Sequence, residues 1–271
     1  MPEVPDLEAI RGFLNRRIVG KKVQRVDVFI PIVVRIPRND FVRLLTGDTF
    51  GEVQRHGKFL LFTFASGRVM VINPMLTGRF AYVDRKEKRR ARTCFALAVD
   101  DEHELRYADE RVMGRVYLVP LEELHTVPQF AEMGPDVLSP ELTEEVFRER
   151  LRRHNGMIKG ILVNHRFVAG IGNAYADEIL WEARIHPYRK RTQLSDEDVG
   201  RLYAAVRAVF EWAIPIVARV FSESLDYTEW RDHLRVHRRG GQPCPRCGTR
   251  ISEITAGQRI TSFCRTCQPG P

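Results

Sequence analysis

Two pairs of cysteines near the end of the chain constrain its fold more than any other feature of the sequence. Two residues separate Cys244 from Cys247 and Cys264 from Cys267, and sixteen residues lie between the two pairs. Each pair can supply two thiolates from a tight turn, and the residues between the pairs can fold back as a β-hairpin. The spacing therefore predicts one structural zinc ion, bound by four sulfur atoms and without an open position for catalysis. A redox-active pair of cysteines is the alternative.

The positive net charge of the chain narrows the classes of partner. Its 271 residues include 43 Lys and Arg against 35 Asp and Glu, which gives a net charge of +8. This excess of positive charge favours a nucleic acid as the binding partner, followed by an anionic membrane surface. The alternative is a basic surface that has no polyanionic partner. No apolar run is long enough to span a membrane, and the acidic start does not resemble a signal peptide. We expect a cytoplasmic protein in which Cys94 is a buried small hydrophobe.

The first half of the chain has the pattern of a β-rich domain that begins with a helix. Apolar residues recur at helical spacing across residues 5–18, and Gly20 follows them. Short segments rich in Val, Ile, Phe and Tyr come next, which predicts an antiparallel sandwich or barrel. A short helix is expected at 39–46, and the charged run 86–92 is expected to form a solvated, mobile loop. The expected strands are 22–36, 48–55, 58–65, 68–73, 79–84, 93–100, 104–108 and 115–119.

The second half has a helical pattern, and four prolines between residues 120 and 140 separate it from the first. We interpret this proline-rich stretch as a linker between domains. Helices are expected at 143–153, at 157–165, from the Gly170 corner to about 183, and at 195–213 with a kinked continuation past Pro215. The expected division is a catalytic β-sandwich domain at 1–125, a linker at 126–140, a helical domain at 141–235 and a zinc finger at 236–271.

The N-terminus, Met1-Pro2-Glu3, has the composition of a nucleophilic site. Removal of Met1 is expected because a small residue follows it, and Pro2 would then carry a free secondary amine. Such an amine attacks carbonyl-like carbons and forms an iminium with sugar aldehydes, and Glu3 could move the protons that this requires. A frayed, inert terminus is the alternative when these residues are considered by themselves.

A glycine-rich corner, Gly170-Ile171-Gly172-Asn173, precedes another predicted helix. Backbone N–H groups at a helix start can bind phosphate, and glycines let a nucleic-acid backbone approach closely. Asn173 could cap the helix and donate a hydrogen bond to a phosphate oxygen. The spacing does not match the dinucleotide-binding motif, and an ordinary helix–turn–helix corner is the alternative.

These features occur in the order found in the formamidopyrimidine-DNA glycosylase / endonuclease VIII family, which the chain resembles over its whole length. The resemblance rests on Pro2-Glu3, on the corner from Gly170 to Glu178 and on the four-cysteine finger. It implies an α+β fold with an N-terminal antiparallel β-sandwich, flanking helices, and a C-terminal helix-two-turn-helix domain with a zinc-finger β-hairpin. Damaged double-stranded DNA would lie between these domains, and the protein would be a monomer with one structural zinc.

The resemblance also implies roles for individual residues. Pro2 is expected to attack C1′ of the damaged nucleotide, Glu3 to assist base departure and sugar-ring opening, and Lys58 to contact a phosphate beside the lesion. The nucleotide must leave the duplex before its C1′ can be attacked, and phosphate contacts would stabilise the bent backbone that this needs. Further DNA contacts are implied at Lys159, Gly172, Asn173 and Arg259.

A second group of residues is expected to fill the space that a flipped nucleotide leaves. Arg111 corresponds to the family's intruding arginine and could bond the orphaned base. Met113 stands where the family usually has phenylalanine, and Leu76 stands near its inserted methionine, with Met75 as the alternative register. A leucine or methionine can still wedge apart a base step.

Two departures from the family pattern concern the choice of base. Residues 221–230 form a shorter and different segment where members specific for 8-oxoguanine carry a loop that closes on the flipped base, and Asp6 replaces a usual glutamate. We expect an enzyme that removes formamidopyrimidine or 8-oxoguanine bases and then cleaves the strand by β,δ-elimination, in the nucleoid of a prokaryote. The alternatives are an oxidised-pyrimidine glycosylase, a catalytically silent binder of damaged DNA, and a plain zinc-ribbon nucleic-acid module.

Overall fold

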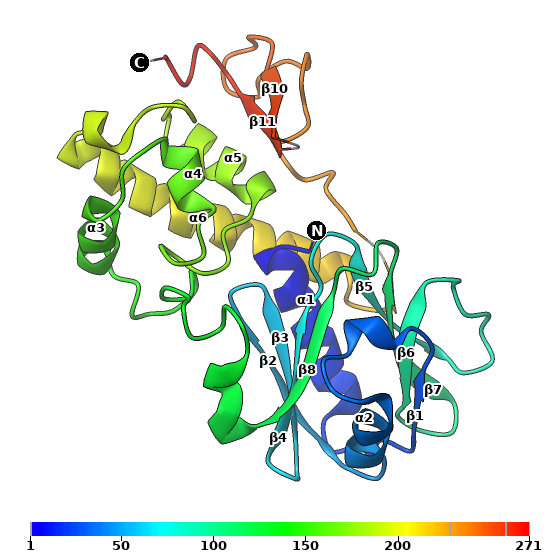
Figure 1. The fold of residues 1–271 in the computed structure, drawn as a ribbon. Coiled ribbons are helices and arrows are strands. Elements are labelled where there is room, and N and C mark those ends of the chain that lie inside the picture. Colours follow the sequence, from blue (N-terminus) through cyan, green and yellow to red (C-terminus); the bar gives the residue numbers. More distant parts are fainter. Residues whose placement is uncertain (1, 228, 258, 271) are drawn as a thin grey trace. The chain divides into compact units, whose positions relative to one another are not determined.

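The structure, a computed structural model, describes residues 2–227, 229–257 and 259–270 and consists of two compact units (Figure 1). The prediction that Met1 is removed concerns a residue outside this described part of the chain. The first unit comprises Met1–Ala131 and Ile216–Trp230, and the second comprises Glu132–Pro215 and Arg231–Pro271.

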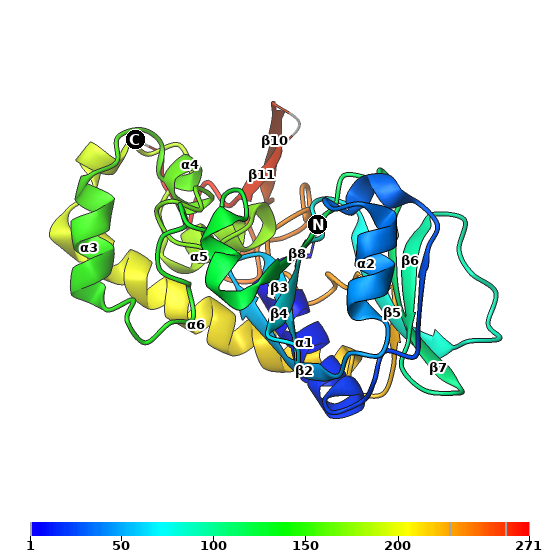
Figure 2. The ribbon, with the colours of Figure 1, turned by 60° about the horizontal axis from the view of Figure 1, so that its bottom comes forward.

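Two antiparallel sheets, two whole helices and the end of a third build the described part of the first unit. The five-stranded sheet has the order β1-β6-β7-β5-β9, and the four-stranded sheet has the order β2-β3-β4-β8. Helix α1 lies beside β2 and β3, and α2 lies beside β1 (Figures 1 and 2). The elements are α1 (Val4–Ile18), β1 (Arg25–Val28), α2 (Arg38–Leu45), β2 (Phe50–His56), β3 (Phe59–Phe64), β4 (Arg68–Asn73), β5 (Gly78–Asp84), β6 (Thr93–Ala98), β7 (His103–Asp109), β8 (Arg115–Pro120) and β9 (Leu225–Asp226), with short 3₁₀ turns at Pro31–Val33 and Leu121–Thr126.

The core of this unit lies between the two sheets, which confirms the predicted sandwich. Phe62 of β3 packs against Phe80 of β5 with ring centroids 6.1 Å apart, so the contact joins one sheet to the other. The apolar face of α1 enters the same core through Phe13 and Leu14. Burial of large apolar side chains is the main source of stability in such a layered unit. Cys94 is part of this core, and burial raises the pKa of its thiol to about 12, as expected of a small hydrophobe.

The second unit is helical and ends in a hairpin. Ser195 and Asp198 cap α6 reciprocally, because each side chain accepts the other's backbone N–H, at 3.1 Å and 3.0 Å. This helix continues past Pro215, as predicted, and its final turn belongs to the first unit. The elements are α3 (Glu144–Arg152), α4 (Ile158–Leu162), α5 (Asn173–Glu182), a 3₁₀ turn at Arg191–Gln193, α6 (Asp196–Val220), β10 (Ser252–Ala256) and β11 (Arg259–Phe263).

Three local predictions differ from the structure. The expected strand 22–36 is reduced to β1, because Pro31 lacks a backbone donor and the chain turns there. The expected helix 157–165 ends at Leu162. Residues 216–230, which were expected in the helical domain, group with the first unit because β9 pairs with β5 over a long sequence separation.

Candidate active site and nucleic-acid interface

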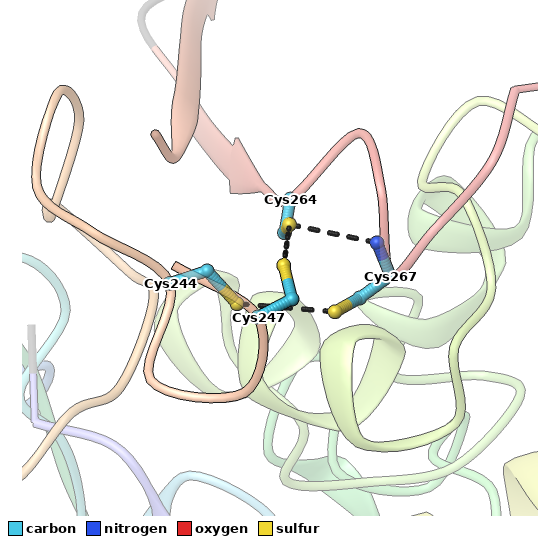
Figure 3. A group of neighbouring side chains, drawn as sticks. All are labelled: Cys244, Cys247, Cys264 and Cys267. Atoms are coloured by element: carbon cyan, nitrogen blue, oxygen red, sulfur yellow. Dashed lines mark hydrogen bonds between the residues drawn. The ribbon is translucent and has the colours of Figure 1, made fainter. Parts of the chain in front are cut away.

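The four cysteines of the two sequence pairs converge from two turns (Figure 3). Their Sγ atoms all lie within 4.8 Å of one another. The closest cross-pairs are Cys247 with Cys264 at 3.4 Å and Cys244 with Cys267 at 3.9 Å. Four sulfur atoms bound tetrahedrally to zinc at about 2.3 Å stand about 3.8 Å from one another. The set therefore fits one structural zinc with all four positions taken, as predicted.

Neighbouring side chains connect the zinc-binding turns to helix α5. The indole Nε1 of Trp181 donates to the Sγ of Cys244 at 3.4 Å. Arg246 donates to the carbonyl of Trp181 at 2.8 Å, and its guanidinium stacks over the indole 4.0 Å from the centroid. Hydrogen bonds from Thr249 lower the pKa of Cys247 to about 6. Such partners orient metal ligands and favour their thiolate form.

The predicted nucleophile and acid lie at the start of α1. Pro2 and Glu3 are both buried, and Glu3 is the residue that caps the helix. Its backbone N–H donates to Oδ2 of Asp6 at 2.8 Å. Asp6 therefore holds the backbone beside Pro2 in place, which is the structural role of the carboxylate that departs from the family pattern.

A small pocket beside Pro2 contains charged residues that the sequence did not single out. The guanidinium of Arg79 pairs with the carboxylate of Glu229 and donates to the carbonyl of Gly78 at 2.8 Å. Glu229 belongs to the segment that follows α6, and the pairing of β9 with β5 brings this segment to the pocket. The pocket is lined by Pro2, Asp6, Ile10, Arg79, Phe80, Leu225 and Glu229.

Lys58 lies in the turn between β2 and β3, and this turn is tied to α1. Gly57 has a φ of 57°, a left-handed conformation that glycine adopts readily. Arg55 donates to the carbonyl of Gly57 at 2.9 Å and to Oε1 of Glu8 at 2.6 Å. Because Glu8 is on the helix that Glu3 caps, this chain of contacts fixes the Lys58 turn relative to the N-terminus.

The residues expected to fill the vacated stack lie on two loops at one end of the five-stranded sheet. Leu76 is on the loop between β4 and β5, and Arg111 and Met113 are on the loop between β7 and β8. Leu76 is 40% exposed and Met113 is 39% exposed, so both side chains are accessible at the surface. Exposed apolar side chains on fixed loops are what a base-step wedge requires.

In the second unit, three of the expected DNA contacts line one pocket. Lys159 comes from α4, Asn173 from α5, and Arg259 from β11. Gly172, and not Asn173, caps α5, and the Asn173 side chain instead donates to the carbonyl of Ile260 at 2.8 Å. The structure therefore brings these residues together, while the expected helix-capping role of Asn173 is wrong.

Lys159 is more deeply embedded than a surface phosphate contact would be. It is only 7% exposed. Its Nζ lies 2.6 Å from Oδ1 of Asp177 and donates to the Ile260 carbonyl at 2.8 Å and to Thr261 Oγ1 at 2.9 Å. The lysine therefore joins α4 and α5 to the hairpin of the finger.

The acidic pair that ends the glycine-rich corner forms a polar core that was not predicted. Oδ2 of Asp177 accepts hydrogen bonds from His237 Nδ1 at 2.7 Å and from the Ser262 backbone at 3.0 Å. Glu178 accepts three backbone N–H groups from residues 235–237. Burial raises the pKa of Glu178, although these donors oppose the shift. The only sequence signal was the presence of two acids within an apolar helix.

Comparisons with known proteins match each part of this architecture. Residues 1–116 match the formamidopyrimidine-DNA glycosylase N-terminal domain, residues 133–223 its H2TH domain, and residues 241–270 the zinc finger found in FPG and IleRS. The formamidopyrimidine-DNA glycosylase of Symbiobacterium thermophilum is 39% identical over 100% of this chain and 90% of its own length. No helix in the described residues is long and apolar enough to cross a membrane.

Solved structures agree with the sequence relatives. Lactococcus lactis Fpg bound to DNA that contains N7-benzyl-Fapy-dG has a TM-score of 0.91 and 29% identity. The same enzyme bound to DNA with an oxidised pyrimidine has a TM-score of 0.90 and 29% identity. Each comparison covers 99% of this chain and 100% of the other.

A sandwich unit joined to a helical unit with a four-cysteine finger, together with these relatives, defines a base-excision-repair DNA glycosylase with the AP lyase activity typical of its class. The chain belongs to the formamidopyrimidine-DNA glycosylase family.

Proposed function

We propose that this protein removes oxidised bases of the formamidopyrimidine and 8-oxoguanine type from duplex DNA, with Pro2 as the nucleophile. The observation that carries this proposal is the burial of Pro2 and Glu3 at the start of α1, beside a pocket that contains Arg79 and Glu229. A buried site removes water from around the amine, which favours its neutral, nucleophilic form.

In the proposed reaction, the nitrogen of Pro2 attacks C1′, the bond from C1′ to the base breaks, and the departing base takes up the proton that the amine loses. Glu3 donates a proton to the sugar-ring oxygen, and the ring opens to give an iminium on Pro2. Loss of a proton from C2′ then expels the 3′ phosphate, and a second elimination expels the 5′ phosphate. Hydrolysis of the remaining iminium by water frees the amine of Pro2.

The DNA contacts are a proposal that rests on the resemblance to the family and that the positions of these residues support. Lys58, Lys159, Gly172, Asn173 and Arg259 are assigned to the phosphate backbone. Their placement on tight turns and helix starts supports this assignment, because those positions approach a backbone closely. The embedded ammonium of Lys159 suits it to shaping the pocket that it shares with Arg259. Leu76, Arg111 and Met113 are assigned to the space left by the flipped nucleotide.

The remaining predictions about the whole protein are proposals of the same kind. We infer a monomer that works on damaged double-stranded DNA in the cytoplasm, associated with the nucleoid. The domain limits 1–125, 141–235 and 236–271, with a linker at 126–140, stay a prediction, except that residues 216–230 group with the first unit. An oxidised-pyrimidine activity is the second candidate, and the Lactococcus lactis structure with an oxidised pyrimidine in its DNA favours it.

Borohydride trapping tests the proposal. Duplexes with 8-oxoguanine, a formamidopyrimidine, an oxidised pyrimidine or an abasic site would be incubated with the wild-type, Pro2→Gly and Glu3→Gln proteins. A covalent product on one damaged base that requires Glu3 supports the glycosylase and identifies its substrate class. Trapping on the abasic duplex alone would leave a lyase without base removal. Binding without any trapping would replace the proposal with a catalytically silent binder.

A further inference from the structure

Asp109, the last residue of β7, is fully buried where two loops meet. Its Oδ1 accepts a hydrogen bond from the hydroxyl of Thr77 and one from the Arg111 backbone at 3.2 Å, and its Oδ2 accepts one from the Gly114 backbone at 2.6 Å. The Arg111 backbone also donates to Thr77 Oγ1 at 3.0 Å. Thr77 belongs to the 74–77 loop, and Arg111 and Gly114 belong to the 110–114 loop. One carboxylate therefore holds both loops.

The two loops share an unusual backbone feature next to their exposed tips. Met75, with a φ of 48°, directly precedes Leu76, and Val112, with a φ of 54°, directly precedes Met113. Left-handed conformations are disfavoured for residues other than glycine, and a β-branched residue such as Val112 is a clear outlier. Such strain persists only where the surroundings over-determine it, and it concentrates at functional sites. Here each strained residue directly precedes an exposed apolar side chain.

A buried aromatic residue lies directly beneath both loops. The hydroxyl of Tyr107 lies between Gly78 and Gly114, the residues that end the two loops. A Cβ would lie 2.2 Å from this hydroxyl at Gly78 and 1.9 Å from it at Gly114, and both distances are shorter than any real contact. The loops are therefore seated on a buried aromatic residue at two positions where only glycine fits.

We propose that Asp109 is a positioning residue that holds Leu76 and Met113 as a single two-pronged wedge, already arranged before DNA arrives. This rests on the proposed function, in which both side chains enter the base stack. Unstacking a base step costs several kcal/mol. A wedge that needs no ordering on binding loses less free energy at that moment than a flexible one. The strain at Val112 belongs to the same arrangement, because the hydrogen bonds of Asp109 offset it.

The test compares Asp109→Asn with Glu104→Gln. Both changes replace a buried carboxylate of β7 with an amide, but Glu104 binds Arg106, at 2.6 Å. The DNA is a duplex with a tetrahydrofuran abasic analogue opposite 2-aminopurine, whose fluorescence reports stacking. We expect Asp109→Asn to bind this duplex about tenfold more weakly, which corresponds to one lost hydrogen bond to a charged group, and to show a smaller fluorescence change. Glu104→Gln should stay within about twofold of the wild type.

A double-mutant cycle separates positioning from general stability. If Asp109 acts through the wedge, Asp109→Asn should have little further effect in a Leu76→Ala/Met113→Ala protein, since the side chains that it positions are absent. An undiminished loss of affinity in that background would overturn the proposal, because Asp109 would then act on DNA binding by another route. Affinity for an undamaged duplex and the melting temperature would be measured alongside.

Val112→Gly provides a variant that keeps every hydrogen bond of Asp109. Glycine removes the strain, so the melting temperature should hold or rise, while the loop gains freedom and the fluorescence change should shrink. Wild-type affinity and fluorescence in this variant would overturn the claim that the strained arrangement matters. None of these measurements requires base removal. Failure of the borohydride test would therefore reject the chemistry of Pro2 and leave the wedge result interpretable.

Discussion

The protein buries two acidic side chains at the start of α1 and two within α5, and it uses the two pairs differently. In the first unit, Asp6 accepts the backbone N–H of Glu3, the residue that caps α1, and so fixes the backbone beside Pro2. In the second unit, Asp177 and Glu178 accept hydrogen bonds from the segment that leads to the zinc finger and from the finger itself. One pair fixes the backbone at the helix end where the proposed nucleophile lies, and the other joins α5 to the segment that carries the zinc finger. Burial of a carboxylate therefore does not by itself identify a catalytic one.

Removal of zinc should produce the largest difference between the two units, because it should affect the second unit and not the first. Structural zinc contributes about 10–16 kcal/mol to the folding of small zinc-binding peptides, so the hairpin of the finger should lose its structure on chelation. The Lys159 and Asp177 contacts with Thr261 and Ser262 would be lost with it. We expect DNA affinity to collapse while borohydride trapping persists at high DNA concentration. Zinc content, affinity and trapping would be measured on the same samples, with zinc added back as the control.

Substitution of Glu3 should stop chemistry and leave the fold intact. Loss of a general acid typically slows a reaction by about 10²–10⁴-fold, so Glu3→Gln should reduce base removal by this factor under single-turnover conditions. The amide keeps the shape of the side chain, and affinity for damaged duplex should change little. A Glu3→Gln protein that still removed bases at a wild-type rate would place the acid elsewhere. Asp40→Asn, a change to a carboxylate on α2 that is 46% exposed, is the control.

Substitution of Asp177 should lower stability and DNA affinity and leave the chemistry intact. Asp177→Asn leaves the ammonium of Lys159 buried without its charged partner, and breaking a buried pair in this way costs about 3–5 kcal/mol. We expect a lower melting temperature and weaker DNA binding, with the rate of base removal unchanged once the DNA is saturating. Asp196→Asn is the control, because this side chain is 97% exposed. An unchanged melting temperature would show that the pair does not support the second unit.

The smallest expected effect concerns acid stability in the first unit. Burial raises the pKa of Asp100, but hydrogen bonds from Lys21 and from the backbone of His103 and Glu102 outweigh it and hold this pKa well below its usual range. The stabilisation is therefore complete above the unfolded pKa, near 3.9, and is lost as the pH falls below it. For a pair exposed to this degree we expect at most about 1 kcal/mol. Urea unfolding from pH 6 to pH 2 should show a shallower decline for Asp100→Asn than for the wild type.

Local patterns predicted the elements that depend on near neighbours in the chain. Helix α1 and most strands of the sandwich follow from apolar periodicity. The expected strand 22–36 failed because Pro31 interrupts it, and β9 was missed because two residues have no periodicity to detect. The loop 86–92 is exposed, as expected. Its carbonyls at residues 87 and 88 accept hydrogen bonds from buried Arg106, a contact that the run of charges did not reveal.

In the candidate site, too, the sequence revealed what depends on near neighbours and missed the contacts between distant residues. The zinc ligands were found from spacing, because a CxxC pair forms a ligand-bearing turn from adjacent residues. The partners of Arg79 and Lys159 could not be found, since Glu229 is 150 residues from one and Thr261 is 102 residues from the other. No short-range pattern connects residues that far apart.

By itself, the sequence determined the four zinc ligands, the Pro2-Glu3 terminus, the order of β-rich and helical parts, and the family to which they belong. Only the tertiary structure decided that Arg79 and Glu229 share the pocket of Pro2, that Lys159 is embedded, and that Asp109 joins two loops. The physical reason is that a buried polar group must find a partner wherever packing places one. Periodicity and spacing specify which side chains are buried, whereas the packed core specifies which of them meet.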